Sequence, residues 1–361
     1  MKRLIAVSAA LAAITAVLSA GLDAQQPKLT PEERMLIARS MEQPQASAYP
    51  VPMPAGVNLE VLPVLGNVFM IVTPKGNIAA QIGEEGVLLV DSSTADVSDQ
   101  VVKAIAAMTR RKINYIINTS FDPDRFGGNE NLSNAGANPT TAMQALPGPG
   151  TPLPDTTGNN QAQLRITGAI MVAHENTLNR MSAPTGETST VPFAFWPSNT
   201  FFTPKKTMSF NDEAIELKHA PSAYTDGDVL VFFRQSDVVA TGAVVDTLGY
   251  APFDPKRGGS IKGVLSSLND VIDMTVPRFN QQAGTRVVPG RGRILNEADV
   301  VEYRDMITII HDRVKLAVDK KMTLAQLKAQ QPTLDYDGLY STPALTGDQY
   351  VEMIWAELTK K

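Results

Sequence analysis

Residues 113–132, INYIINTSFDPDRFGGNENL, restrict the possible folds more than any other stretch of the chain. The stretch begins with β-branched and aromatic residues, enters a polar turn after Asn118, and presents Gly127-Gly128 ahead of a segment that is predicted to be a helix. A buried strand that ends in polar residues is typical of an α/β sheet, in which sites lie at the carboxyl ends of the strands. We therefore expect the polar turn to hold the chemistry.

This turn resembles the metal-binding motif of the metallo-β-lactamase superfamily, which reads T-H-x-H-x-D-H-x-G-G-N. Residues 119–129 of this sequence read TSFDPDRFGGN, so the frame of the motif matches. Asp124 keeps the family residue, whereas Ser120, Asp122 and Arg125 stand where the family has histidines. The resemblance implies an α/β fold with a degenerate metal-binding motif.

Three later segments are similar to those that supply the remaining zinc ligands of the family, namely AYTDG at 223–227, TGA at 241–243 and PGRG at 289–292. Tyr224, Ala243 and Arg291 occupy the ligand places. Because zinc prefers imidazole, thiolate and carboxylate ligands, we expect neither the family zinc nor another cofactor. None of the three histidines, His174, His219 and His311, falls at a ligand place, and we interpret each as a packed or surface residue.

The candidate residues of a ligand pocket are those at the altered positions together with Asp124: Ser120, Asp122, Asp124, Arg125, Tyr224 and Arg291. Carboxylates left without a metal in a partly buried turn are costly, and a guanidinium is well suited to pair with them. The hypothesis is that Arg125 or Arg291 pairs with Asp124 and replaces zinc as the link between the two halves. Asp122 and Asp124 are also the candidates for a catalytic base.

The N-terminus predicts export. Residues 1–24 combine Lys2-Arg3, an apolar run and small residues, as secretory signals do. No second apolar run predicts a membrane span in the mature chain, and the chain has no cysteine. The net charge of −5 gives no reason to expect a nucleic-acid partner. We expect a secreted or periplasmic protein.

The resemblance implies the αββα sandwich of the superfamily over residues 56–320. Residues 25–55 are expected to form an N-terminal helix, Thr30–Met41, and a proline-rich linker, and residues 321–361 a C-terminal helical tail. Asn296 is predicted to cap a long helix that runs towards Lys320.

Two stretches are predicted to be irregular. Residues 133–163 are rich in Asn, Thr, Pro and Gly and are expected to form a surface loop. Residues 182–207 carry Phe193, Trp196 and Phe202 among their aromatic residues. They either fold onto the core or form an aromatic wall beside a ligand pocket.

Three functions agree with these features. The first is a non-catalytic relative of the metallo-hydrolases that binds an anionic or aromatic small molecule. The second is a hydrolase that acts without the zinc site, with Asp122 or Asp124 as its base. The third is a structural subunit that binds a protein partner through the aromatic stretch and the helical tail. Substrate or ligand identity does not follow from the fold.

Overall fold

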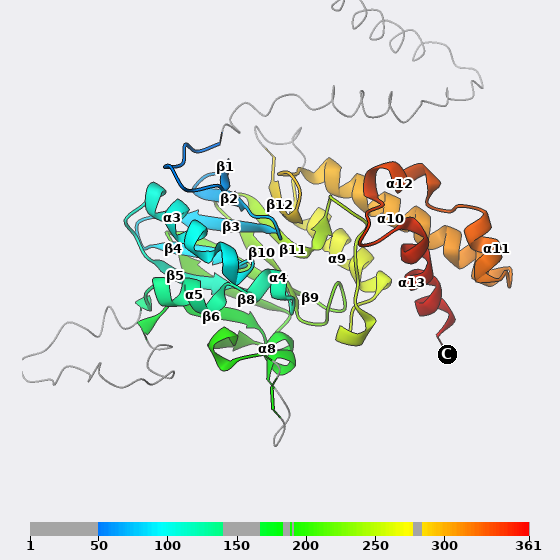
Figure 1. Cartoon of the computed structure of the whole chain (residues 1–361), viewed down its shortest axis with the longest axis horizontal. Helices are drawn as coiled ribbons and strands as arrows, with labels where there is room; N and C mark the ends of the chain where they lie inside the picture. Colours follow the sequence, from blue (N-terminus) through cyan, green and yellow to red (C-terminus); the bar gives the residue numbers. More distant parts are fainter. Residues whose placement is uncertain (1–49, 140–166, 183–187, 190, 277–283, 361) are drawn as a thin grey trace, which may run out of the picture. The chain divides into compact units, whose positions relative to one another are not determined.

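The computed structural model describes residues 50–139, 167–182, 188–189, 191–276 and 284–360. In these residues two β-sheets lie face to face, and helices cover the outer face of each sheet (Figure 1). The predicted signal at 1–24, the predicted helix Thr30–Met41 and most of the predicted loop at 133–163 lie outside the described residues. None of the helices in the described part is long and apolar enough to cross a membrane.

The first sheet follows the order of the chain. Its strands in the described residues are β1 (Glu60–Leu65), β2 (Val68–Val72), β3 (Asn77–Ile82), β4 (Val87–Val90), β5 (Ile113–Ile117), β6 (Ile170–His174) and β7 (Asn199–Phe201). The strands β1 to β4 pair antiparallel, whereas β4 to β7 pair parallel. The carboxyl ends of β4 and β5 therefore lie at the same edge of the sheet.

The second sheet has the order β12-β11-β10-β9-β8. Its strands are β8 (Lys205–Phe210), β9 (Glu213–Ala220), β10 (Asp228–Phe233), β11 (Val238–Asp246) and β12 (Arg286–Arg291). The last two strands pair parallel, and their register places Asp246 opposite Arg291 at their carboxyl ends.

The helices of the first half are α3 (Ser98–Met108), α4 (Pro123–Phe126), α5 (Asn129–Ala135) and α8 (Glu175–Met181), with the short 3-10 helices η1 (Ala95–Val97) and η2 (Phe193–Phe195). Those of the second half are α9 (Ile261–Met274), α10 (Glu297–Asp319), α11 (Leu324–Ala329), α12 (Leu334–Tyr340) and α13 (Gly347–Thr359), with the 3-10 helix η3 (Pro255–Arg257).

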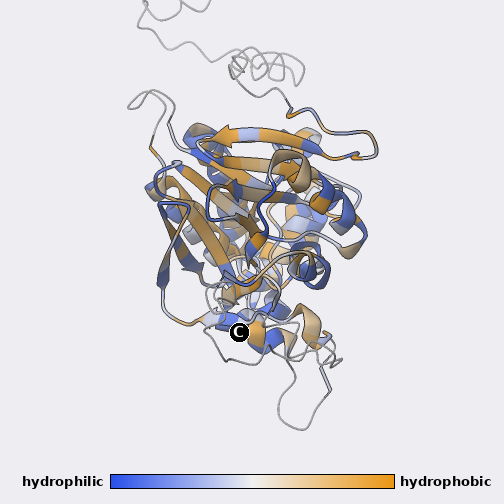
Figure 2. Cartoon of the chain, turned by 90° about the vertical axis from the view of Figure 1, so that its left-hand side faces the viewer, coloured by the Kyte–Doolittle hydropathy of each residue, from blue (hydrophilic) through white to orange (hydrophobic). Residues whose placement is uncertain are grey.

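Three buried apolar clusters hold these four layers together. One lies between the sheets, one joins the first sheet to α3 and α5, and one joins the second sheet to α9, α10 and α13. Along β4 the side chains alternate: Leu88 and Val90 belong to the cluster between the sheets, whereas Val87 and Leu89 face the helices. The strand β4 is accordingly hydrophobic on both faces. Figure 2 shows that hydrophobic residues predominate in most strands. This arrangement is the predicted αββα sandwich.

Local capping signals determine where several helices begin. Asn296 caps α10 and forms a capping box with Asp299, as expected for the long helix. Thr323 and Thr346 cap α11 and α13 in the same way. The C-terminal region is thus helical, as predicted, and it is made of α11, α12 and α13. Leu327 and Ile354 of this tail are buried in the same cluster as the helices of the second half.

The aromatic stretch packs mainly onto the body of the protein. Phe201 lies in β7 and is buried between the sheets, and the Trp196 indole donates a hydrogen bond to the Val191 carbonyl oxygen at 2.9 Å. Phe202 is exposed. None of these aromatic rings lines the cavity described below, so the packing interpretation of the stretch is the one that the geometry supports.

Candidate functional site

The polar turn after β5 contains a one-turn helix, α4, that the sequence did not lead us to expect. Asp122 caps this helix: its carboxylate accepts a hydrogen bond from the Asp124 backbone N–H at 2.9 Å, and Pro123 occupies the first helical position. Adjacent residues of a helix point in different directions. The side chains of Asp124 and Arg125 therefore leave the turn on different sides.

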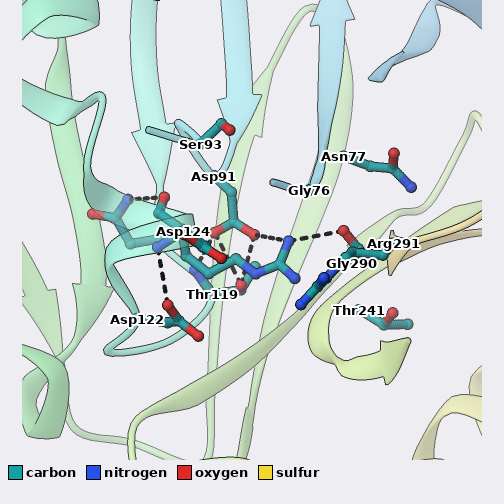
Figure 3. Close-up of polar contacts among 12 residues, drawn as sticks. Gly76, Asn77, Asp91, Ser93, Thr119, Asp122, Asp124, Thr241, Gly290 and Arg291 are labelled. Atoms are coloured by element: carbon teal, nitrogen blue, oxygen red, sulfur yellow. Dashed lines mark hydrogen bonds and ion pairs between the residues drawn. The ribbon is translucent and has the colours of Figure 1, made fainter. Parts of the chain in front are cut away.

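Arg125 points into the protein. Its side chain is only 5% exposed, and its Nη1 donates a hydrogen bond to the carbonyl oxygen of Gly290 in β12 at 3.0 Å. The same nitrogen lies 3.8 Å from the carboxylate of Asp91, which follows β4 (Figure 3). This guanidinium therefore contacts both sheets.

Asp91 is the buried partner of this guanidinium. Its backbone has a positive φ of 68°, and its carboxylate accepts hydrogen bonds from the Thr119 backbone N–H and hydroxyl at 2.8–2.9 Å. Burial raises the pKa of the Asp91 carboxyl to about 6, although Arg125 and the Thr119 hydrogen bonds act in the opposite direction. Arg125 and Asp91 thus form a buried charge pair, and the Thr119 hydroxyl donates hydrogen bonds to its carboxylate.

Glycines make room for the Arg125 side chain. A Cβ atom at Gly76 would lie 2.6 Å from Nη1 of Arg125, and one at Gly290 would lie 2.5 Å from its Nη2. Gly242, with a φ of +52°, allows Thr119 to approach in the same manner, because a Cβ there would lie 2.0 Å from the Thr119 hydroxyl. The glycines of the segments at 241–243 and 289–292 therefore accommodate side chains that arrive from the first sheet.

The prediction that Arg125 or Arg291 pairs with Asp124 is wrong. Neither Arg125 nor Arg291 forms an ion pair with Asp122 or Asp124 in the described residues. The Asp124 carboxylate, which is partly exposed, accepts no hydrogen bond from another described residue. For Arg125 the reason is geometric, because it is adjacent to Asp124 in one helical turn and the two side chains point in different directions.

Arg291 pairs instead with Asp246. The two residues lie opposite each other at the ends of β12 and β11, and the Arg291 Nε is 3.2 Å from the Asp246 carboxylate. Burial raises the pKa of Asp246, and both Arg291 and Arg125 lower it. The two arginines are therefore electrostatically coupled to one carboxylate. The Arg291 side chain is 44% exposed and remains accessible to solvent.

The matching end of the motif, Gly127-Gly128-Asn129, has a structural role. Asn129 and Asn118 exchange two side-chain hydrogen bonds of 2.9 Å, and Ser92 donates a third to the Asn129 side-chain oxygen. This network ties the ends of β4 and β5 to the start of α5. Asn129 therefore has a structural role that does not require a metal ion.

Five of the six predicted pocket residues line one cavity of about 480 Å³: Asp122, Asp124, Arg125, Tyr224 and Arg291. Burial, followed by the charge of Asp122 and a hydrogen bond with it, raises the pKa of the Tyr224 hydroxyl. Ser120, the sixth predicted residue, does not line this cavity. It is fully buried, and its hydroxyl has no hydrogen-bond partner among the described residues.

The donor atoms at this cavity do not fit the zinc site that the resemblance implies. Permanently charged guanidinium groups, those of Arg125 and Arg291, stand at two ligand places and the protonated phenol of Tyr224 at a third, while Asp122 is occupied as a helix cap. Within the described ranges, no cluster of three or more histidine, aspartate or glutamate side chains is placed to hold a metal ion.

The histidines lie away from the cavity. His174 and His219 stack on each other with ring centroids 3.6 Å apart, and His174 caps α8. Burial and His219 lower the pKa of His174 to about 4. His311 lies in α10. The prediction of packed or surface histidines agrees with this geometry.

The resemblance already implies one of the two buried carboxylates, because in the superfamily the aspartate that ends the strand at 87–90, here Asp91, lies at the site-facing edge. Sequence reasoning did not include Asp246, although it ends an apolar strand, which is the signal that identifies it. It also missed one wall of the cavity, to which the C-terminal residues Thr342, Ala344, Leu345 and Met353 contribute. No local pattern in the sequence connects them to the polar turn.

Comparisons with solved structures agree with this architecture. The stereoselective inverting sec-alkylsulfatase from Pseudomonas sp. is 12% identical, with a TM-score of 0.59, over 83% of this chain and 50% of that chain. A metallo-β-lactamase from Pontibacter korlensis is 15% identical, with a TM-score of 0.47, over 70% of this chain and 99% of that chain. This chain thus spans about half the length of the alkylsulfatase, and the likeness concerns the fold.

A search of curated proteins found no match. The family model described as "Metallo-beta-lactamase superfamily" matches residues 63–279, which is more than half of the chain. The matched region contains both sheets except β12 and the first half of β1, and it includes the polar turn with Arg125. The chain therefore belongs to the metallo-β-lactamase superfamily.

Proposed function

We propose that this chain is an exported member of the superfamily that does not use zinc chemistry and that binds a small anionic molecule in the cavity beside α4. The signal-like residues 1–24 support export to a periplasm or to the outside of the cell. The observation that carries the proposal is the position of Arg125. Its guanidinium lies buried between Asp91 and the Gly290 carbonyl, at a motif position where the family has a zinc-binding histidine.

The exposed guanidinium of Arg291 supports an anionic ligand. Arg125 and Arg291 line the cavity beside the carboxylates of Asp122, Asp124 and Asp246. Asp91 compensates Arg125 from the buried side. Arg291 contacts Asp246 through Nε, and its two Nη groups have no partner among the described residues. A guanidinium that is held at one nitrogen and accessible at the others is suited to receive a carboxylate, sulfate or phosphate group.

Metal content tests the first half of the proposal. The purified full chain is incubated with zinc, desalted and analysed by mass spectrometry for metals, and a β-lactam and a carboxylic ester are offered with and without zinc. We expect far less than one zinc per chain and no turnover that a chelator removes. Stoichiometric zinc that supports chelator-sensitive hydrolysis would overturn the proposal.

Anion binding tests the second half. Calorimetric titration with acetate, benzoate, sulfate and phosphate is expected to show binding that Arg291→Gln weakens at least about tenfold, because a charge-assisted pair contributes about 1.5–3 kcal/mol. Arg234→Gln is the matched control, because Arg234 is also exposed and pairs with one carboxylate, Glu216, but does not line the cavity. Equal binding by both variants would contradict the assignment.

One observation favours a second candidate, a metal-free hydrolase. The Asp124 carboxylate lines the cavity without a partner among the described residues, as a general base requires. Zinc-independent ester hydrolysis that Asp124→Asn abolishes would show that the protein is a metal-free hydrolase and not only a binding protein.

A further inference from the structure

The cavity has two chemically different sides. The charged side comes from the turn after β5 and from the ends of β11 and β12, and it presents Arg125 and Arg291 together with Asp122, Asp124 and Asp246. The other side is apolar and is formed by Leu248, Pro252, Ala344, Leu345 and Met353. Three of these five residues belong to the C-terminal segment, which lies beyond the part of the chain that the family model matches.

The C-terminal segment is fixed in place beside the cavity. The Tyr250 backbone N–H donates a hydrogen bond to the Tyr340 carbonyl oxygen at 3.2 Å, and the Tyr250 hydroxyl donates one to Asp337 at 2.7 Å. The rings of Tyr250 and Tyr350 stack with centroids 4.8 Å apart, and Tyr350 is fully buried. The loop between α12 and α13 is therefore a built wall of the cavity.

An anion with a large apolar body is the ligand that fits both sides. An inorganic anion satisfies the guanidinium groups but leaves Leu345 and Met353 in contact with water. An aromatic carboxylate or sulfonate places its charge on Arg291 and covers the apolar wall, and each buried methylene-sized group adds to its affinity. A cavity of about 480 Å³ is large enough for such a molecule.

We infer that Leu345 and Met353 of the C-terminal segment determine which anion this protein binds, and that they select organic anions with an aromatic or otherwise bulky apolar body. This inference rests on the proposed function, because it assumes that the charged group of the ligand lies at Arg291. It assigns to the C-terminal helices a role in ligand selection, which the fold of the matched region does not provide.

The test uses the full chain and three probes of increasing apolar size: acetate, phenylacetate and 1-naphthylacetate. In the unaltered protein, affinity measured by calorimetry is expected to rise along this series. Leu345→Ala and Met353→Ala are each expected to lower the affinity for 1-naphthylacetate about tenfold, and to affect the affinity for acetate far less. Leu345→Trp, which fills the cavity, is expected to exclude 1-naphthylacetate and to retain acetate.

Leu339→Ala is the matched control, because Leu339 lies in α12 of the same tail, is 60% exposed and does not line the cavity. Near-ultraviolet circular dichroism and the melting temperature establish that each variant is folded. Should an alanine variant fail to fold, the volume-conserving Leu345→Met and the bulkier Leu345→Trp still compare the probes.

The outcomes distinguish the inference about Leu345 and Met353 from the proposed binding of an anion at Arg291. The inference is overturned if binding depends on Arg291 but is equal for all three probes. It is also overturned if Leu339→Ala and Leu345→Ala affect binding equally. Either result leaves the proposed function standing. Absence of any Arg291-dependent binding overturns the proposed function itself. Loss of 1-naphthylacetate affinity in the Leu345 and Met353 variants, with acetate affinity retained, supports both.

Discussion

The Arg125 guanidinium lies 3.8 Å from the Asp91 carboxylate, and both side chains are at least 95% buried. Its Nη1 also donates to the Gly290 carbonyl oxygen, so one side chain connects the end of β4 to β12 in the other sheet. A buried charge pair is strongly destabilised when one partner is removed, because the other charge remains without compensation.

Replacing Arg125 by Met is expected to lower the free energy of unfolding by about 3–5 kcal/mol at pH 7.5. The loss depends on pH, because Arg125 lowers the pKa of Asp91, and without it that pKa rises above about 6. The folded variant then holds a proton that the unfolded chain, with an ordinary carboxyl pKa of 3.8, releases. Its stability therefore falls as pH rises through that higher pKa. The penalty relative to the unaltered protein shrinks as pH falls from that higher pKa to about 6, below which both folded proteins hold the proton.

Urea denaturation at pH 4.5 and pH 7.5 measures this difference. Arg291→Met serves as the control, because Arg291 is 44% exposed and its loss is expected to cost about 1 kcal/mol or less. A penalty for Arg125→Met that is small and independent of pH would show that the charge pair does not stabilise the fold.

The glycines around Arg125 are expected to respond differently to alanine. Gly76→Ala places a Cβ 2.6 Å from Nη1 of Arg125, so it should destabilise the protein by about 1–3 kcal/mol and lose most of this effect in an Arg125→Ala background. Gly290→Ala should remain costly there, because its Cβ would also lie 2.2 Å from the Gly242 carbonyl oxygen. A double-mutant cycle of unfolding free energies gives both coupling terms, and equal coupling would contradict the geometry.

Asp122 is expected to act on stability through helix capping. Asp122→Ala removes the acceptor of the Asp124 backbone N–H and should cost about 1 kcal/mol, whereas Asp122→Asn keeps a good cap and should cost much less. Asp124→Asn, at a carboxylate without a partner among the described residues, should change stability by less than about 0.5 kcal/mol. Thermal unfolding of the three variants ranks these effects. A loss for Asp122→Asn as large as that for Asp122→Ala would instead assign the effect to charge.

His174 is expected to reduce stability in acid. Its folded pKa is about 4, below the ordinary 6.5, because it is buried against His219 and its Nδ1 accepts the Asn176 backbone N–H. The unfolded chain therefore binds a proton that the folded chain resists, and stability falls as pH drops from about 6.5 to about 4. Asp226, the other charged group near the stack, opposes this effect.

The variant His174→Asn keeps a capping acceptor and removes this titration, so its stability should fall less than that of the unaltered protein over the same pH range. Because Asp91 titrates in both proteins, the difference between the two pH profiles isolates His174. His311→Gln, in α10, is the control. Identical profiles for all three proteins would show that His174 does not titrate with unfolding.

The elements with strong local signals could be predicted, and those without such signals could not. The long helix after Asn296 and the strand at 113–117 followed from a cap and from β-branched periodicity. The one-turn helix α4 and the short strand β7 were missed, because a stretch of three or four residues is too short for a period to appear. The predicted pocket residues gathered at one cavity, with the exception of the buried Ser120.

The sequence by itself determined the features that depend on residues within a few positions of one another. These are the succession of strands along the chain, the helix caps, the glycine pair and the motif without its histidines. The partners of the arginines were decided only by the tertiary structure. Asp91 meets Arg125 because parallel strands bring their ends together, and Asp246 meets Arg291 through the register of β11 and β12. The apolar wall from the C-terminal segment arises from packing between residues about a hundred positions apart, which no local pattern in the sequence encodes.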